Sequence, residues 1–289
     1  MKIVKFSLEQ GNKYFGEIDG DRFFIGKRVP YLGNKGLMNI TGTPEQKYNR
    51  ADFHAVFGFW ADFIHPTAMA EGGFYHTLNT YDKAYFTFSF LQFAAHVPNG
   101  DFVRYFRALL KLQNAAEYFP DLVLHNNRIA RVTDTGLVIL ESDDSTKNLM
   151  KYLNPSVSSI EDTEVIQAAR FIHWVQNDPE HRQTQIEIGI TIFKEKMIEY
   201  ARPRQYRLDG VDDSICLVIA DIRHQGRAKS PEILTALRSS KPLENLLKIG
   251  ETEYHERLVA LKREIKVLTD EGTLGKRKYS TAENDFVKK

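Results

Sequence analysis

The alternation of apolar and polar residues predicts short strands at the beginning of the chain. Residues 2–8 alternate, and two further apolar runs flank the pair Asp19-Gly20. An Asp-Gly pair between two such runs is a strong hairpin signal. The following stretch, 29–50, is rich in Pro, Gly, Asn and Thr, which is typical of a loop or linker. We therefore predict a small N-terminal β segment and linker over residues 1–50.

Apolar residues spaced three and four positions apart predict helices over most of the remaining chain. The first helix covers 51–70 and contains Pro66, which would kink it or restart it. A second hairpin is predicted between 128 and 140. The segment 271–289 is polar and is predicted to be a mobile tail. Further helices are expected at 102–112, 165–176, 180–200, 211–225, from 230 onward and at 251–268.

The composition is that of a globular protein, with 42% hydrophobic and 27% charged residues in a chain of 289. The net charge of +1 gives no reason to expect a nucleic-acid partner. No window approaches about eighteen consecutive apolar residues, so no membrane span is expected. The N-terminal sequence lacks an apolar signal region. The protein is therefore expected to be made in the cytoplasm and to reach the periplasm or cell wall through a dedicated apparatus or lysis.

The residues that could form a disulfide or hold a metal are not arranged to do so. Cys216 is the only cysteine and lies in an apolar run, as a buried small hydrophobe would. His173 and His181 are far apart in sequence and His224 stands alone, so no metal-ligand spacing is present. The chain also lacks a Gly-rich phosphate loop and a Gly-x-Ser-x-Gly elbow. No metal and no cofactor are expected.

The candidate chemistry is concentrated in the stretch Glu71–Phe93. Glu71 directly follows an apolar run, and Asp82 ends the polar turn segment 79–82. Glycoside cleavage requires one carboxyl group to protonate the leaving oxygen and a second to activate water or attack the sugar. The two acids can face each other only if the segment between them folds back as a hairpin. The alternative interpretation is that Glu71 is a helix-end acid and Asp82 a turn residue.

This stretch resembles the chitosanases of the lysozyme-like superfamily. In those enzymes a Glu ends a helix, an Asp opens the next motif, and a Thr five positions later holds the attacking water. The corresponding residues here are Glu71, Asp82 and Thr87. Two later stretches also resemble the family: Trp174–Gln185 is similar to its segment with Trp, Asp-Pro, Arg and Gln, and Ala220–Gly226 to its later helix.

The chain departs from the chitosanase pattern after the Asp. Lys83 and Ala84 stand where the family usually has glycines, and the spacing from Glu71 to Asp82 is shorter. The short segments EGGF and QFAAH are more similar to the peptidoglycan-cleaving muramidases of phages and secretion systems. The resemblance implies a mainly α (α+β) fold: a lysozyme-like, two-lobed helical catalytic domain with a small β wing over residues 51–270.

The function implied is hydrolysis of the glycan strand of peptidoglycan, with Glu71 as general acid, Asp82 as base and Thr87 holding water. Burial among apolar neighbours would have to raise the pKa of Glu71 for this role. The alternatives are a chitosanase and a non-catalytic glycan-binding component of a phage or secretion apparatus. The implied partners are peptidoglycan or a related amino-sugar polymer, an immunity protein and a delivery apparatus. The predicted substrate-binding residues are Tyr81, Tyr85, Gln92 and His96.

Overall fold

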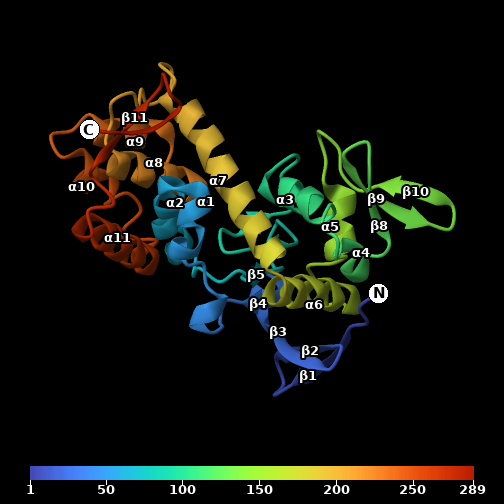
Figure 1. Cartoon of the computed structure of the whole chain (residues 1–289). Coiled ribbons are helices and arrows are strands. Elements are labelled where there is room, and N and C mark those ends of the chain that lie inside the picture. The colour runs from blue at the N-terminus through green and yellow to red at the C-terminus, as the bar shows by residue number, and fades with distance from the viewer. The chain divides into compact units, whose positions relative to one another are not determined.

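The computed structural model describes residues 1–289 and has an α+β fold (Figure 1). Helices make up 43% of the chain and strands 20%. The predicted fold, a mainly α lysozyme-like domain with a small β wing, is therefore wrong. The strands expected to form the wing instead continue the N-terminal strands in one seven-stranded antiparallel sheet. Only β5 (Leu78–Asn79) pairs with an N-terminal strand, whereas the other two short strands pair with β5 and with each other.

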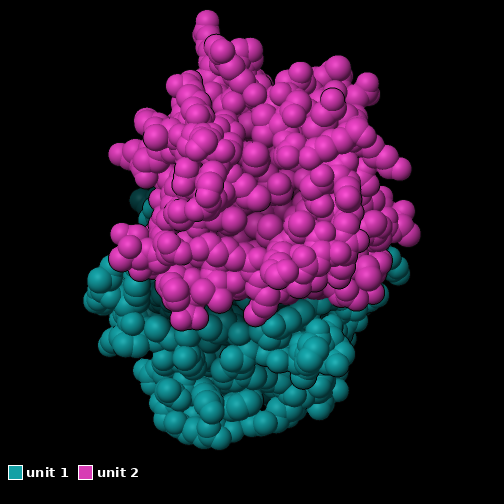
Figure 2. All heavy atoms as spheres, turned by 90° about the vertical axis from the view of Figure 1, so that its left-hand side faces the viewer, with its two compact units in different colours: residues 1–47, 72–188 teal, residues 48–71, 189–289 magenta.

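The chain forms two compact units, and each unit is built from two separate segments (Figure 2). Unit 1 contains residues 1–47 and 72–188, and unit 2 contains residues 48–71 and 189–289. The sequence predicted successive domains, whereas the chain leaves unit 1 and later returns to it. The long helix α7 (Pro179–Ala201) contains the last of these boundaries.

The strands of the large sheet in unit 1 lie side by side in sequence order. Strand β4 pairs with β5 through Met38 opposite Asn79 and Asn39 opposite Leu78. This register joins two segments that are distant in the sequence. The strands are β1 (Lys5–Glu9), β2 (Lys13–Ile18), β3 (Asp21–Tyr31), β4 (Asn34–Asn39), β5 (Leu78–Asn79), β6 (Thr87–Phe88) and β7 (Phe93–Ala94).

The remaining elements of unit 1 are four helices, a short 3-10 turn and a three-stranded sheet, and this sheet contains the hairpin predicted between 128 and 140. The helices are α3 (Asp101–Leu109), α4 (Ala115–Tyr118), α5 (Lys147–Leu153) and α6 (Asp162–Asn177), and the 3-10 turn is η1 (Pro44–Gln46). The second sheet consists of β8 (Leu122–His125), β9 (Arg128–Thr133) and β10 (Gly136–Ile139).

Phe171 of α6 lies at the centre of the aromatic core of unit 1 and has no solvent exposure. Side chains from strand, loop and helix segments between residues 86 and 119 surround it, so this core joins α6 to segments that lie well before it in the sequence. Aromatic pairs at such separations stabilise a core beyond their buried area. The ring centroid of Phe171 lies 5.0–6.3 Å from the centroids of Phe86, Phe88, Phe102, Tyr105, Phe106 and Phe119.

Unit 2 is helical, and its first predicted helix is interrupted. Gly58 adopts φ 54° and ψ −137°, which separates α1 from α2, whereas Pro66 lies inside α2 without ending it. The predicted helices near 211–225, 231 and 251–268 are confirmed as α8, α9 and α11. The elements are η2 (Arg50–Phe53), α1 (His54–Phe57), α2 (Phe59–Ala70), α8 (Asp213–Gln225), α9 (Ser230–Leu237), α10 (Pro242–Leu246) and α11 (His255–Asp270).

The segment predicted to be a polar, mobile tail contains an ordered hairpin, β11 (Arg277–Ser280) with β12 (Asp285–Lys288). Phe286 is buried, and its ring centroid lies 4.8 Å from that of Phe63 in α2. The indole nitrogen of Trp60 donates a 2.8 Å hydrogen bond to Asp285. The ring contact of Phe286 and the hydrogen bond of Asp285 thus hold this hairpin against α2.

We predict that deleting residues 1–39 destabilises unit 1 rather than leaving it intact. The deletion exposes the edge of β5 and removes Leu37, which is fully buried and whose backbone N–H and carbonyl are both hydrogen-bonded to Thr80. Circular dichroism melts of the full chain and of residues 40–289 test this. A cooperative transition at an unchanged temperature would instead show that the N-terminal segment is separable.

Candidate functional site

Glu71 is the last residue of the first segment of unit 2 and caps the C-terminal end of α2. Its backbone N–H is hydrogen-bonded to the carbonyl groups of Thr67 and Ala68, each at 3.1 Å. The next two residues, Gly72 and Gly73, have φ values of 96° and 74°, which glycine adopts without steric cost. The helix therefore ends at Glu71, and its half-buried side chain is 13% exposed.

The carboxylate of Glu71 belongs to a cluster of four charged side chains in unit 2. Arg257 of α11 donates to Glu71 Oε1 from Nη2 at 2.8 Å and from Nε at 3.3 Å. The same guanidinium donates to both oxygens of Asp221 in α8, at 2.8 and 2.9 Å. Arg227, which follows α8, pairs with Asp221 from the other side. The cluster thus consists of two arginines and two acidic side chains.

Asp221 is the buried centre of this cluster, with no solvent exposure. Burial alone would raise the pKa of Asp221, but Arg257 and Arg227 outweigh burial and hold this pKa below its ordinary value. Burial likewise opposes the charge of Arg257, and Asp221 and Glu71 together raise the pKa of Arg257 above its ordinary value. Asp221 and Arg257 are therefore both charged, and Arg257 holds Glu71 in one orientation.

We predict that Asp221→Asn destabilises unit 2 by about 3–5 kcal/mol, because it leaves two buried guanidinium groups with a single carboxylate. Urea unfolding of the wild type and the variant measures this difference. Asp270→Asn is the matched control, since Asp270 pairs with Lys266 on the surface of α11. Similar small effects from both substitutions would mean that the cluster contributes little to stability.

Asp82 lies in unit 1, in the loop between β5 and β6, where its carboxylate shapes a turn. Oδ1 accepts the backbone N–H of Ala84 at 2.8 Å, and Oδ2 accepts the side-chain amide of Asn79 at 3.1 Å. Asn79 also lies directly opposite Thr87 in the β5–β6 pair. The structure thus brings Asp82 and Thr87 together at one end of a hairpin, although Thr87 is buried. Asp82 is therefore a turn residue, as the alternative interpretation of the sequence held.

The four predicted substrate-binding residues all lie in unit 1 but in different surroundings. Tyr81 is half-buried, and its ring centroid lies 5.3 Å from that of Tyr31. Tyr85 and Gln92 adopt φ values of 60° and 53°, and the carbonyl of Tyr85 accepts the side-chain amide of Asn154 at 3.0 Å. His96 is half-buried, and its Nδ1 has no hydrogen-bond partner.

A buried acid that the sequence analysis did not single out supports the loop that carries Asp82. Glu164 of α6 is hydrogen-bonded through Oε1 to the hydroxyl of Thr80, and that hydroxyl accepts the backbone N–H of Leu37 at 2.6 Å. Burial raises the pKa of Glu164 to about 8. Glu164 is therefore protonated at neutral pH. The apolar stripe of α6 predicted the helix, but its polar first turn gave no sign that Glu164 is buried.

We predict that Glu164 makes unit 1 less stable as the pH rises. Its pKa is about 8 in the folded protein and 4.5 ordinarily, so the folded state holds the proton more tightly. The contribution of Glu164 to stability is complete below about pH 4.5 and falls until about pH 8, by on the order of 5 kcal/mol. Glu164→Gln should remove this slope and raise the melting temperature at pH 8.5 but not at pH 4.5. Parallel pH profiles of the two proteins would contradict the assignment.

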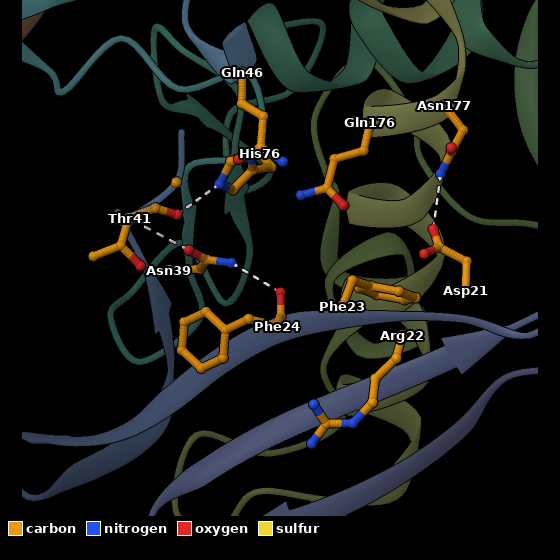
Figure 3. A pocket seen from close by; sticks show the side chains of 11 residues that line it. Asp21, Arg22, Phe23, Phe24, Asn39, Thr41, Gln46, His76, Gln176 and Asn177 are labelled. Carbon is orange, nitrogen blue, oxygen red and sulfur yellow. Dashed lines mark hydrogen bonds between the residues drawn. The ribbon is translucent and has the colours of Figure 1, made fainter. Parts of the chain in front are cut away.

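Unit 1 also contains a polar cavity of about 500 Å³ (Figure 3). Figure 3 shows the Gln176 amide turned toward His76, whereas Arg22 extends away from Phe23 to pair with Glu9. Apart from Gly42, the remaining residues that line the cavity are polar or aromatic, and the only acid among them is Asp21. The cavity is lined by Asp21, Arg22, Phe23, Phe24, Asn39, Thr41, Gly42, Gln46, His76, Gln176 and Asn177.

The histidine of this cavity is neutral and fixed in one tautomer. His76 Nε2 lies 2.8 Å from the carbonyl oxygen of Thr41, which can only accept, so Nε2 carries the proton. Burial lowers the pKa of His76, which keeps the ring uncharged. Gln176 has no side-chain hydrogen bond within the protein, so its amide can donate and accept toward a ligand. This set of groups suits an uncharged polar ligand.

The structure thus places Glu71 in unit 2 and the other six predicted site residues in unit 1. Sequence reasoning missed Arg227, Arg257 and Glu164. One signal was available: Asp221 interrupts the apolar run 214–222, and an acid at such a position requires a buried cation. No such pattern marks the two arginines.

Comparisons with known proteins find no matching family model, no similar curated protein and no similar solved structure. The resemblance to lysozyme-like enzymes therefore rests on the sequence motifs alone. No group of three or more His, Cys, Asp or Glu side chains is arranged to hold a metal ion. None of the helices is both long and apolar enough to cross a lipid bilayer.

Proposed function

We propose that the protein is a glycoside hydrolase that cleaves the glycan strand of peptidoglycan, with Glu71 as the proton donor. The observation that carries this proposal is the way Glu71 is held. It is a partly exposed acid at the end of a helix, and Arg257 binds one of its oxygens while the buried Asp221 fixes Arg257. Proton transfer to a leaving oxygen requires a carboxyl group at a defined position.

The hydrogen bonds of the cluster are compatible with a proton cycle on Glu71. The guanidinium of Arg257 makes two hydrogen bonds to Asp221, and Arg227 supplies a further charge to the same carboxylate. Once Glu71 has given up its proton, Arg257 stabilises the resulting carboxylate. Arg257 is thus a positioning residue, and Asp221 acts on Glu71 only through Arg257. Roles for Asp82 as base and for Thr87 as the residue that holds water stay predictions.

The choice of peptidoglycan rests on the chemistry of the polar cavity in unit 1. Amide groups such as that of Gln176 hydrogen-bond the hydroxyl and acetamido groups of sugars, and Phe23 offers an apolar face for a ring. Chitosan is a polycation, and the single acid Asp21 would be a poor match for it. Delivery to the cell wall by lysis or a secretion apparatus, and a protective immunity protein, belong to the same proposal.

A non-catalytic glycan-binding protein is the second candidate. Its supporting observation is that the polar cavity lies wholly within unit 1 and that ion-pairing of Glu71 with Arg257 also suits a structural acid. This candidate requires glycan binding without turnover. The two candidates are separated by whether loss of the Glu71 proton changes the rate of cleavage.

We predict that Glu71→Gln lowers the release of muropeptides from purified sacculi by roughly 10²–10⁴-fold, because glutamine keeps the shape but carries no acidic proton. Mass spectrometry of the released products measures the rate, and a binding assay on the same sacculi should show retained affinity. Glu256→Gln is the matched control, since Glu256 is an exposed residue of α11 beside Arg257.

Three outcomes would redirect the assignment. Equal rates for the wild type and Glu71→Gln would remove Glu71 from catalysis. Binding without any product from the wild type would favour the glycan-binding candidate. Rapid cleavage of chitosan with intact sacculi would transfer the activity to a chitosanase.

A further inference from the structure

A second cavity of unit 1, of about 480 Å³, carries more positive than negative charge. One wall is a single face of α6, formed by Thr163, Ile166, Gln167 and Arg170, which are spaced three and four apart. The end of α5 and the segment around Pro120 complete the walls. We refer to this site as the α6 cavity.

The one carboxylate in the α6 cavity is already engaged. Asp121 accepts a 3.0 Å hydrogen bond from Arg131 Nε on Oδ2 and a 2.9 Å hydrogen bond from the Tyr152 hydroxyl on Oδ1. The guanidinium carbon of Arg131 also lies 5.5 Å from the centroid of the Tyr152 ring. Asp121 and Arg131 therefore neutralise each other, and the remaining charged side chains of the cavity are Lys151 and Arg170.

Neither of these two cations has a carboxylate partner within the protein. The only side-chain hydrogen bond of Arg170 runs from Nη1 to Gln167 Oε1 at 3.3 Å, and its Nε is buried without an acceptor. The Nη2 group of Arg170 also makes no hydrogen bond within the protein, and an anion in the cavity would accept one from it. Lys151 is exposed at the cavity and adds a second positive charge.

We propose that the α6 cavity binds the free carboxylate of a short, alanine-rich acidic peptide. Arg170 and Lys151 supply the charge, and Gln167 and Thr163 offer partners for peptide groups. Pro120, Pro155 and Ile166 form apolar walls that suit methyl side chains. The volume exceeds that of a small inorganic anion. Identifying this peptide as the stem of peptidoglycan rests on the proposed function, whereas the carboxylate site itself does not.

Titration calorimetry on the full chain tests the site with two matched peptides. The first is Ala-Glu-Ala-Ala with free carboxylates, and the second is Ala-Gln-Ala-Ala with an amidated C-terminus, so that only the charge differs. We expect binding of the first peptide alone, weakened by high salt. Arg170→Gln should lower its affinity roughly 10- to 100-fold, the range of a charge-assisted hydrogen bond. The affinity of Arg170→Lys for the first peptide should lie between those of the wild type and Arg170→Gln.

Lysine variants of α5 provide the matched control. Lys151→Gln removes a charge that lines the cavity, whereas Lys147→Gln removes an exposed charge that does not line it. We expect weaker peptide binding in the first variant and wild-type binding in the second. Thermal melts establish that each variant is folded. Equal affinities of Lys151→Gln and Lys147→Gln, together with an unaffected Arg170→Gln, would overturn the proposal.

Two further outcomes would also overturn it: equal binding of the neutral peptide, and binding of inorganic phosphate with no binding of either peptide. Failure of the proposed peptide site can be distinguished from failure of the proposed hydrolase. Peptide binding by a protein that releases nothing from sacculi keeps the carboxylate site and removes the hydrolase. Release of muropeptides without peptide binding keeps the hydrolase and removes the carboxylate site.

Discussion

A carboxylate without solvent access, Asp221, constrains the arrangement of unit 2. A buried charge is tolerated only with opposite charges at hydrogen-bonding distance, and here Arg227 and Arg257 supply them. These cations come from the chain after α8 and from α11, so the ion pairs fix both segments against α8. The guanidinium of Arg257 has donors left after binding Asp221, and it uses them on Glu71. One buried charge thereby determines the position of the acid at the end of α2.

Unit 1 depends on a corresponding buried contact around Thr80. The hydroxyl of Thr80 meets the backbone of β4 and the side chain of Glu164, and its carbonyl accepts the amide of Asn154 at 2.9 Å. A Cβ atom on Gly36 would lie 2.6 Å from the Thr80 hydroxyl, so only glycine fits beside this loop. The loop that carries Asp82 is consequently fixed by the N-terminal strands, α6 and the segment after α5.

Local patterns in the sequence predicted local structure well. The apolar spacing of α6, α8 and α11 and the turn of the β9–β10 hairpin depend on neighbours within a few residues. The sheet that joins β4 to β5 was not predicted: β4 lies in the stretch 29–50, wrongly predicted to be a loop or linker, and the two-residue strand β5 leaves almost no pattern. The ordered hairpin near the C-terminus was missed for a related reason: Tyr279 and Phe286 are isolated apolar residues in a polar segment.

In the candidate sites, too, local patterns could be predicted from the sequence and contacts between distant residues could not. Glu71 could be singled out because it stands at the end of an apolar run before two glycines. Its partner Arg257 could not, because an arginine on an amphipathic helix resembles any solvated charge. The lack of a carboxylate partner for Arg170 in the α6 cavity is likewise visible only once the surrounding side chains are placed. Pairing between distant charges is a property of the fold, and a single sequence does not encode it in a readable spacing.

The most direct measurement is a crystal structure of Glu71→Gln with an oligosaccharide of the peptidoglycan glycan strand. If Glu71 is the proton donor, the side-chain amide introduced by this substitution should lie about 2.6–3.2 Å from a glycosidic oxygen. Arg257 should remain bound to Asp221 in that complex. A glycan bound with no glycosidic oxygen near position 71 would contradict the assignment of Glu71 as the catalytic acid.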